Sequence, residues 1–156
     1  MRLPAIDSAM EECREHLSTS GAFGTAIEAF LTQYMLTLMC AHFEIHIEGL
    51  LRKRAAASQD AALESLVVSS VSAIFRSCKT SEIAGLLNRF GSDYKDQFQR
   101  LMEESPQAVT RFNNIITNRH KTAHDSGSNI TFDELIRSYD EGHIVLDAVE
   151  KVMFQL

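Results

Sequence analysis

Apolar residues recur along this chain with a helical period, and they predict a series of helices. The longest apolar run, 26–51, is rich in Leu, Met, Ala and Phe rather than in alternating β-branched residues, which favours helix. Its apolar positions surround the helix axis, as expected of a central, buried helix. Glu28, His42 and Glu44 interrupt the run well before about 18 apolar residues accumulate, so we expect no membrane span.

Shorter helices are predicted on both sides of this run. Ser58 is expected to cap one of them, Ser105–Pro106 is a start signal for another, and Thr131 and Glu134 have capping-box spacing before the last. The segment 66–75 could also pass for a strand, but no hairpin turn or partner strand is in sight. The predicted helices are 5–18, 59–77, 80–90, 92–104, one that starts at 106, and 132–154. The sequence therefore predicts an all-α bundle of about five to seven helices in a single domain, 1–156.

The composition is that of a globular protein whose positive charge is local. The chain has 156 residues, 45% of them apolar, and is long enough to bury a substantial core. Its formal net charge of −6 argues against general electrostatic coating of nucleic acid, but it is compatible with an RNA-acting enzyme that has a local basic site. Cys13, Cys40 and Cys78 form no CxxC pair and are predicted to be reduced and mostly buried. The first residues lack the apolar core of a signal peptide, so we expect a cytoplasmic protein.

The most informative segment is 111–129, RFNNIITNRHKTAHDSGSN, which is predicted as the end of a helix followed by a polar turn. At about 100° per residue, Phe112, Ile115 and Ile116 fall on one arc of that helix. Arg119 sits in the middle of the arc, where the pattern calls for an apolar side chain. A guanidinium keeps its proton, so it must face an acid, a neighbouring subunit or an anion.

Two histidines accompany this arginine. His120 and His124 lie on one flank of the arc, and imidazole titrates near neutral pH. Arg111 and Lys121 add positive charge, and no acid occurs between 111 and 124. The segment therefore predicts an anion-binding cluster next to a general acid or base.

The R-x4-H spacing of Arg119 and His124 leaves two interpretations open. Five residues correspond to about 140° on a straight helix, too far apart for a pair on the helix surface. The two side chains converge on one cleft if the helix ends near Ala123, or if a second copy meets the first across a twofold axis. In the alternative interpretation Arg119 pairs with a buried acid and His124 caps the helix.

The stretch NRHKTAH (118–124) resembles the Arg-x4-6-His motif of the HEPN superfamily (higher eukaryotes and prokaryotes nucleotide-binding), which often has the form R-N-x-x-A-H. Arg119, Ala123 and His124 match this form, and His120 stands where Asn is usual. The flanks are similar to the acidic second helix, to the segment before the motif and to the closing helix of the RiboL-PSP-HEPN branch: CAHFEIHIEGLL (40–51), EIAGLLNRFGSDY (82–94) and SNITFDELIRSYDEGHIVLDAVEKVM (128–153). The resemblance covers about residues 25–154.

This resemblance implies a helical bundle that dimerises through its motif helices, with two motifs facing one cleft. It implies a metal-independent endoribonuclease that needs no cofactor and leaves a 2′,3′-cyclic phosphate. His124 would activate the ribose 2′-hydroxyl or protonate the leaving 5′-oxygen, and Arg119 would hold the scissile phosphate. The positions implied to support the site are His120, Glu44 and Asn118, and those implied to bind RNA are Lys121 and Arg111.

The expected partners are an RNA substrate, a second copy of the chain and an antitoxin protein, in a toxin–antitoxin or phage-defence setting. The main alternative is a non-catalytic HEPN-like module that dimerises and binds RNA or protein. A third reading, an adaptor with no role in nucleic-acid binding, predicts that Arg119 is buried in a salt bridge. No GxxxxGK[ST], GxGxxG or GxSxG motif supports nucleotide hydrolysis, dinucleotide chemistry or serine hydrolysis.

Three further features of the 26–54 segment have two readings each. The family resemblance implies that Glu44 is a partner of Arg119 or a brace for the site, and the alternative is a carboxylate that reaches the bundle edge. His42 and His46, spaced i and i+4, could bind a metal from one helix face, but no Cys or HExxH pattern accompanies them and we expect no metal site. The run Arg52-Lys53-Arg54 is either a solvated helix end at the negative pole of the helix dipole or an extension of an RNA track.

Overall fold

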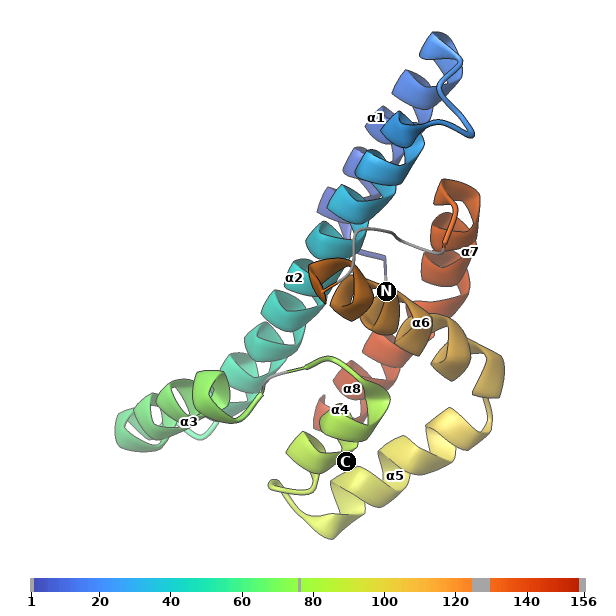
Figure 1. Ribbon diagram of the computed structural model, residues 1–156. Coiled ribbons are helices and arrows are strands. Elements are labelled where there is room, and N and C mark those ends of the chain that lie inside the picture. Colours follow the sequence, from blue (N-terminus) through green and yellow to red (C-terminus); the bar gives the residue numbers. More distant parts are fainter. Residues whose placement is uncertain (1, 76, 125–129, 155–156) are drawn as a thin grey trace.

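The computed structural model describes residues 2–75, 77–124 and 130–154, with the backbone alone described at 72–74 and 122–124. Within these ranges the chain is helical and contains no strand, so the all-α prediction is confirmed. The helices are α1 (Pro4–Ser20), α2 (Ala26–Ala56), α3 (Ala61–Ile74), α4 (Thr80–Leu87), α5 (Ser92–Glu103), α6 (Pro106–His124), α7 (Phe132–Gly142) and α8 (Ile144–Phe154) (Figure 1).

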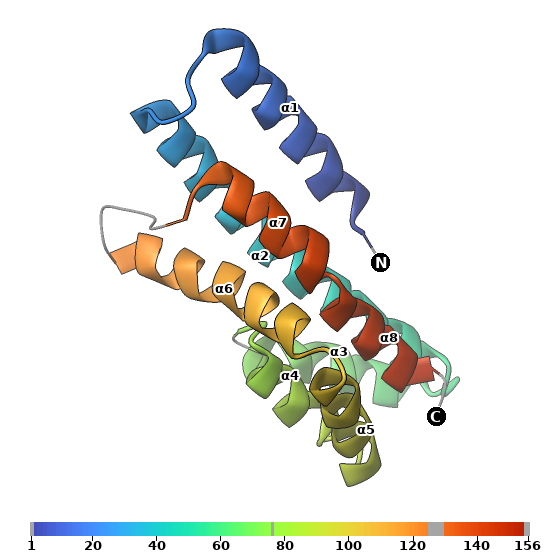
Figure 2. The same ribbon diagram turned by 90° about the vertical axis from the view of Figure 1, so that its right-hand side faces the viewer.

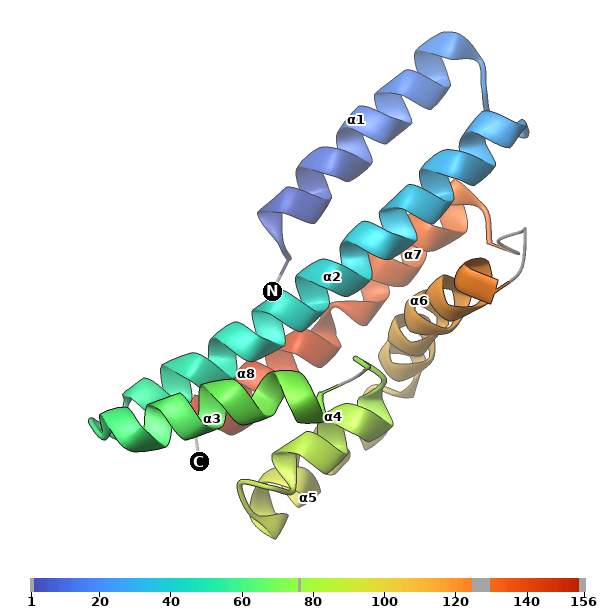
Figure 3. The ribbon, with the colours of Figure 1, turned by 60° about the vertical axis from the view of Figure 1, so that its left-hand side comes forward.

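The helix α2 is the axis on which the others are arranged (Figure 3). Its N-cap is Thr25, whose side chain accepts a hydrogen bond from the backbone N of Ile27 at 3.2 Å. The helix α1 runs beside its first half, α3 packs beside its second half, and α7 and α8 lie along it one after the other (Figures 2 and 3). Buried residues occur on several sides of α2, among them Met35, Phe43 and Leu51, as the apolar run around its axis predicts.

Three aromatic side chains tie α2, α6 and α7 together. The ring of Phe43 stacks on Phe112 with centroids 4.9 Å apart and on Tyr139 with centroids 6.2 Å apart. All three residues are fully buried, and such ring pairs add stability beyond the area they bury. The Tyr139 hydroxyl accepts a hydrogen bond from the backbone N of Leu3 at 2.7 Å, which anchors the residues before α1 to α7.

The helices α6 and α7 approach each other at backbone distance. Gly142, the last residue of α7, is buried, and a Cβ at this position would lie 2.9 Å from the backbone N of Phe112 and 3.0 Å from its Cα. Cβ atoms do not approach a backbone this closely, so the close crossing depends on glycine. This contact fixes the first half of α6 against α7.

The start of α3 differs from the prediction. The carboxylate of Asp60, not the hydroxyl of Ser58, caps the helix and accepts hydrogen bonds from the backbone N of Ala62 at 2.9 Å and of Leu63 at 3.1 Å. Ser58 instead donates to the carbonyl of Ala55 at the end of α2. The prediction of Ser58 as the cap is wrong because the carboxylate two residues later takes the free amides of the first turn.

The predicted last helix is two helices. Its start is confirmed: Thr131 and Glu134 form a reciprocal capping box. However, α7 ends at Gly142, His143 forms a turn, and α8 begins at Ile144. The prediction of one helix over 132–154 is therefore wrong at the position where α7 must approach α6 most closely.

Candidate functional site

The helix α6 carries most of the residues that the sequence singles out. It begins at Pro106, and the carbonyl of Ser105 accepts a hydrogen bond from the backbone N of Val109 at 3.2 Å, as its start signal predicts. Phe112, Ile115 and Ile116 are all buried, so the predicted apolar arc is the face of α6 that joins the core. The helix crosses α2 and packs along α7, and these contacts set the position of its last turns.

A side chain that the sequence did not single out joins α6 to α4. Asn113 accepts a hydrogen bond from the backbone N of Thr80 at 3.1 Å and donates one to the Thr80 hydroxyl at 2.9 Å. Thr80 is the first residue of α4, and Lys79 before it provides no side-chain cap. Asn113 therefore satisfies an amide of the first turn of α4 from outside that helix. Helical spacing within α6 gives no sign of this bond.

Arg119 lies near the end of α6 and is half-buried, on the arc where the sequence pattern places it. Arg119 interacts with neighbouring groups of the protein. Its charge acts on the carboxyl group of Glu44 and on the thiols of Cys40 and Cys78. Glu44 and Cys40 stand one turn apart on α2, so the guanidinium lies where α6 crosses α2.

Glu44 is half-buried and belongs to a mixed-charge cluster on α2 and α6. Burial raises the pKa of its carboxyl group, and the positive charge of Arg119 offsets part of that shift. Glu48, one turn further along α2, raises the pKa of Glu44 as well, and His120 lowers it. The structure thus brings Glu44, Arg119 and His120 into electrostatic range of one another, and we call these three residues the Arg119 cluster.

The remaining motif residues occupy the last turn of α6. His124 is the final residue of the helix, and its side chain, like that of Ala123, lies outside the described part of the structure. His120 is half-buried and Lys121 is exposed. The helix therefore extends to the end of the motif.

One predicted supporting residue, Asn118, and one predicted RNA-binding residue, Arg111, have local partners. The Asn118 amide nitrogen donates to the carbonyl of Asn114 at 2.9 Å, one turn back along α6. The Nε of Arg111 donates to Glu141 on α7 at 3.1 Å, in a half-exposed ion pair. Because Arg111 is eight residues before Arg119, their Cα atoms are about 12 Å apart along the helix axis. The structure does not bring Arg111 together with Arg119.

The three cysteines are buried, and two of them, Cys40 and Cys78, lie near Arg119. Cys13, Cys40 and Cys78 are free and buried, as predicted. Burial raises the pKa of Cys40 to about 12 and raises that of Cys78 as well, and Glu44 contributes to both shifts. Both thiols therefore stay protonated at neutral pH, and they act as apolar packing beside Arg119.

His42 and His46 are both half-buried on α2. Burial lowers the pKa of His46, and its Nε2 atom is buried without a hydrogen bond to the described residues. Among the side chains that the structure describes, no three of His, Cys, Asp and Glu gather closely enough to hold a metal ion.

Of the three basic residues at the end of α2, two contact aromatic side chains and one is exposed to solvent. The ammonium group of Lys53 lies 4.9 Å from the ring centroid of Phe154, and Arg54 donates a hydrogen bond to the hydroxyl of Tyr94 at 2.8 Å. Arg52 is exposed. Two of the three cations therefore take part in packing at this helix end.

The surface of α2 next to the cluster is unusually apolar. We call it the α2 stripe, and its residues with their exposed fractions are Phe23 (42%), Ile27 (46%), Phe30 (68%), Tyr34 (54%) and Ile45 (63%). Ile27, Phe30, Tyr34 and Ile45 follow one another by three, four and eleven residues, which keeps their side chains on one face of the helix, and Phe23 lies just before the first turn. Large apolar side chains that gather on a surface mark an interaction site. The stripe ends beside Glu44, so it borders the Arg119 cluster.

In the part of the chain that the structure describes, no helix is both long enough and apolar enough to cross a membrane.

Comparison with known proteins identifies the family. The chain matches the profile of the RiboL-PSP-HEPN family over residues 6–154, a longer segment than the expected 25–154 because it includes most of α1. No curated protein and no solved structure matches the chain. The match extends from α1 to the last residue of α8 and includes the Arg119 cluster and the α2 stripe. This chain belongs to the RiboL-PSP-HEPN family of the HEPN superfamily.

Proposed function

We propose that this protein is a metal-independent endoribonuclease that cuts RNA in a cleft shared by two copies of the chain. The observation that carries the proposal is the place of Arg119. In a chain of the RiboL-PSP-HEPN family, this cation is half-buried at the end of α6 and lies in electrostatic range of Glu44 and His120. A guanidinium beside a carboxyl group and an imidazole suits the transfer of a phosphoryl group.

The proposed reaction breaks the bond between phosphorus and the 5′-oxygen. The ribose 2′-oxygen attacks the adjacent phosphorus and loses its proton to a general base, while the leaving 5′-oxygen takes up a proton. The products are a 2′,3′-cyclic phosphate and a 5′-hydroxyl end. His124 transfers one of these protons, and Arg119 stabilises the negative charge that develops on the phosphate oxygens.

The other residues of the cluster hold these two in place or bind RNA. Glu44 is a positioning residue, since its carboxylate attracts Arg119 from α2. His120 provides a second titratable group, and Asn118 supports the last turn through its bond to Asn114. Lys121 is exposed at the end of α6 and contacts the RNA backbone. Arg111 would contact RNA further from the scissile bond.

The α2 stripe supports a second copy of the chain as the partner. A twofold axis beside the stripe would bury Phe30 and Tyr34 of both copies and bring the two α6 ends toward one cleft. The net charge of −6 per chain opposes this association, so apolar burial must drive it.

Substitution within the stripe tests this arrangement. Phe30→Lys is expected to convert the dimer to a monomer, because it places a charge in the middle of the apolar contact. Size-exclusion chromatography with light scattering measures the mass. Ile144→Lys is the matched control, since Ile144 is also exposed (42%) but lies on α8, away from the stripe. A native protein that is monomeric at micromolar concentration, or a Phe30→Lys variant that remains dimeric, would contradict the composite cleft.

The proposed activity is tested by incubation of the purified protein with RNA in EDTA. We expect cleavage, cyclic-phosphate ends, and loss of cleavage when the nucleotide on the 5′ side of the scissile bond carries 2′-deoxyribose. The physical reason is that the attacking group is then absent. Cleavage of the deoxy substrate, or complete inhibition by EDTA that added metal reverses, would exclude the proposed mechanism.

We further propose that this nuclease acts as a toxin or as an effector of phage defence, and that an antitoxin protein silences it. Family membership supports a role in RNA metabolism, and restraint is needed because RNA cleavage harms the host cell. Growth arrest on expression of the native chain, relieved by His124→Ala, would support this setting.

A non-catalytic RNA- or protein-binding dimer is the second candidate. The electrostatic coupling of Arg119 to Glu44 favours it, because the carboxylate offsets part of the charge available to a phosphate. The two candidates differ in their response to 2′-deoxy RNA: a binding module holds it as tightly as RNA and cuts neither.

A further inference from the structure

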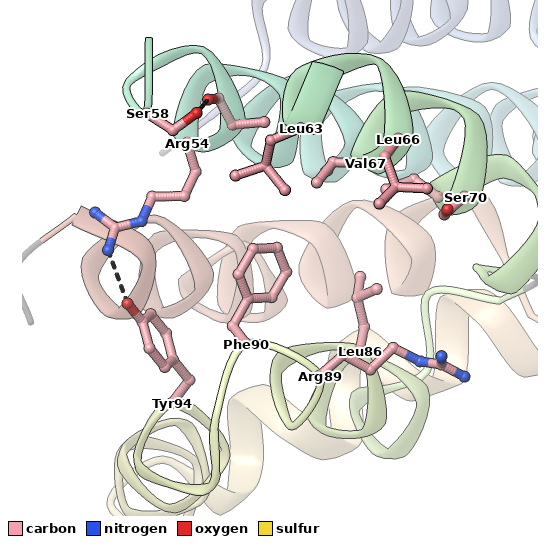
Figure 4. Close-up of a pocket in the computed structure, with 12 residues that line it drawn as sticks. Arg54, Ser58, Leu63, Leu66, Val67, Ser70, Leu86, Arg89, Phe90 and Tyr94 are labelled. Atoms are coloured by element: carbon pink, nitrogen blue, oxygen red, sulfur yellow. Dashed lines mark hydrogen bonds between the residues drawn. The ribbon is translucent and has the colours of Figure 1, made fainter. Parts of the chain in front are cut away.

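A cleft at the far end of the molecule from the α2 stripe belongs to none of the features described above. It lies between α3 on one side and α4 and α5 on the other, with the end of α2 forming part of its wall (Figure 4). Its volume is about 510 Å³, in the range of roughly 300–1,000 Å³ that is usual for small-molecule sites. None of its lining residues belongs to the Arg119 cluster.

The body of the cleft is aliphatic. Leu63, Leu66 and Val67 project into it from α3, and Leu86 and Phe90 face them from the α4 side (Figure 4). Leu66 remains 62% exposed and Leu63 43% exposed, so the two leucines of α3 have no adequate cover within the described chain. An apolar ligand in the cleft would remove this area from water, which is favourable.

One end of the cleft is cationic. Arg54 is half-buried there and donates a hydrogen bond from Nη2 to the Tyr94 hydroxyl at 2.8 Å, with its guanidinium 6.0 Å from the centre of the Tyr94 ring. A guanidinium carries five N–H donors, and a phenol oxygen does not balance its charge. None of the salt bridges between described residues includes Arg54, and no Asp or Glu lines the cleft. The bond to Tyr94 holds the cation at the cleft and leaves it ready for an anion.

Arg89 lies at the other end of the cleft, on the far side of Leu86 in Figure 4, and is exposed. The polar groups of the cleft are thus these two arginines, the Tyr94 hydroxyl and the hydroxyls of Ser58 and Ser70. The walls between the arginines offer few hydrogen-bond donors. This pattern fits a ligand with an apolar body and an anionic head, and it does not fit a polar ligand such as a sugar.

From this geometry we propose that the cleft binds an amphiphilic anion: an unbranched aliphatic chain in contact with the α3 leucines, with a carboxylate head at Arg54. A carboxylate accepts two parallel hydrogen bonds from a guanidinium, which a single neutral oxygen cannot do.

Decanoate, below the concentration at which it forms micelles, is the probe for this proposal. The native protein is expected to bind one decanoate per chain, as measured by isothermal titration calorimetry. Decanol, which has the same chain and no charge, is expected to bind about tenfold more weakly, and acetate, which has the charge and no chain, is not expected to bind. In amide NMR spectra, decanoate is expected to shift the signals of α3 and of residues 86–94.

Two variants assign the head group. Arg54→Gln is expected to weaken decanoate binding about tenfold and to leave decanol binding unchanged. Arg52→Gln is the matched control, because Arg52 lies half a turn away on the same helix, is exposed and does not line the cleft. It is expected to bind decanoate as the native protein does.

Several outcomes would overturn the proposal. They are no saturable binding of decanoate to the native protein, equal affinity for decanol and decanoate, or NMR shifts confined to the α2 stripe. Equal losses in Arg52→Gln and Arg54→Gln would show a general charge effect rather than a site. If Arg54→Gln fails to fold, the comparison of decanoate with decanol and the NMR map still decide the question on the native protein. RNA cleavage is measured separately, so the two proposals stand or fall independently.

Discussion

Replacement of Arg119 or of His124 by alanine is expected to lower the rate of RNA cleavage by about 10²–10³-fold. Removal of one donor that stabilises charge in a transition state costs about 10²–10³-fold, and loss of a general acid or base costs a similar factor. Arg119→Lys is expected to recover only part of the rate, since an ammonium keeps the charge but not the planar pair of donors. Single-turnover rates on one labelled RNA, measured in EDTA with enzyme in excess, give these factors directly.

The control for this experiment is Arg100→Ala. Arg100 is an exposed cation near the end of α5, and it has no part in the proposed site. It is expected to leave the cleavage rate unchanged, which separates the effect of Arg119 from a general loss of positive charge. Circular dichroism must show the same helix content in all variants. If folded Arg119→Ala and His124→Ala proteins cleave RNA at the native rate, the proposed roles of both residues are wrong.

The same assay shows whether Glu44 positions Arg119 or takes part in proton transfer. Glu44→Gln keeps the size of the side chain and removes the charge that attracts Arg119 from α2. A positioning role predicts that cleavage slows while its pH dependence keeps the same form, because Glu44 does not itself transfer a proton. A pH profile that loses one of its limbs would instead make Glu44 an acid–base group.

Substitution of Gly142 by alanine is expected to lower the free energy of unfolding by about 1–3 kcal/mol, the usual cost of overpacking. The new Cβ would lie 2.9 Å from the backbone N of Phe112 and 3.0 Å from its Cα, and backbone atoms cannot rotate away as a side chain can. The helices α6 and α7 would have to separate, which would also disturb the stacking of Phe112 on Phe43. Urea denaturation followed by circular dichroism measures the loss.

Gly49→Ala is the matched control for this substitution. Gly49 lies within α2, and a Cβ at this position would meet no atom within 4 Å. Alanine is the better helix former, so Gly49→Ala is expected to raise stability by about 0.5–1 kcal/mol. The opposite signs of the two changes would separate the crowding at Gly142 from the intrinsic preference of the helix. Equal stability of Gly142→Ala and the native protein would show that α6 and α7 adjust without cost.

Local signals were enough to predict most of the helices. Pro106 and the Thr131–Glu134 box are patterns of a few neighbouring residues, and both mark helix starts in the structure. The glycine at position 142, where α7 ends, has a different cause. Its neighbours favour helix, and the glycine is required by the backbone of Phe112, thirty residues earlier in the chain. No pattern within 132–154 carries that information.

The same distinction applies to the candidate site. The apolar arc of α6 predicted that Arg119 would need a partner, and family resemblance suggested Glu44. The carboxyl group of Glu44 and the buried thiols of Cys40 and Cys78 come near the guanidinium only through tertiary contacts of α6 with α2 and with the residues before α4. The bond between Asn113 and Thr80 likewise depends on the meeting of two helices, so helical spacing within α6 could not reveal it.

The place of Glu28 bears on the order in which the molecule is completed during synthesis. This carboxylate, in the first turn of α2, accepts hydrogen bonds from the backbone N of Gly24 at 2.6 Å and from that of Phe132 at 3.0 Å. Residues 28 and 132 leave the ribosome about 5–20 s apart at ordinary rates of translation. The surface of α2 that packs against α7 and α8 also stays uncovered until those two helices have been synthesised. A nascent chain that has already made α6 therefore still lacks the hydrogen bond between Glu28 and Phe132, and the nuclease proposed here would be complete only after α7 and α8 have been made.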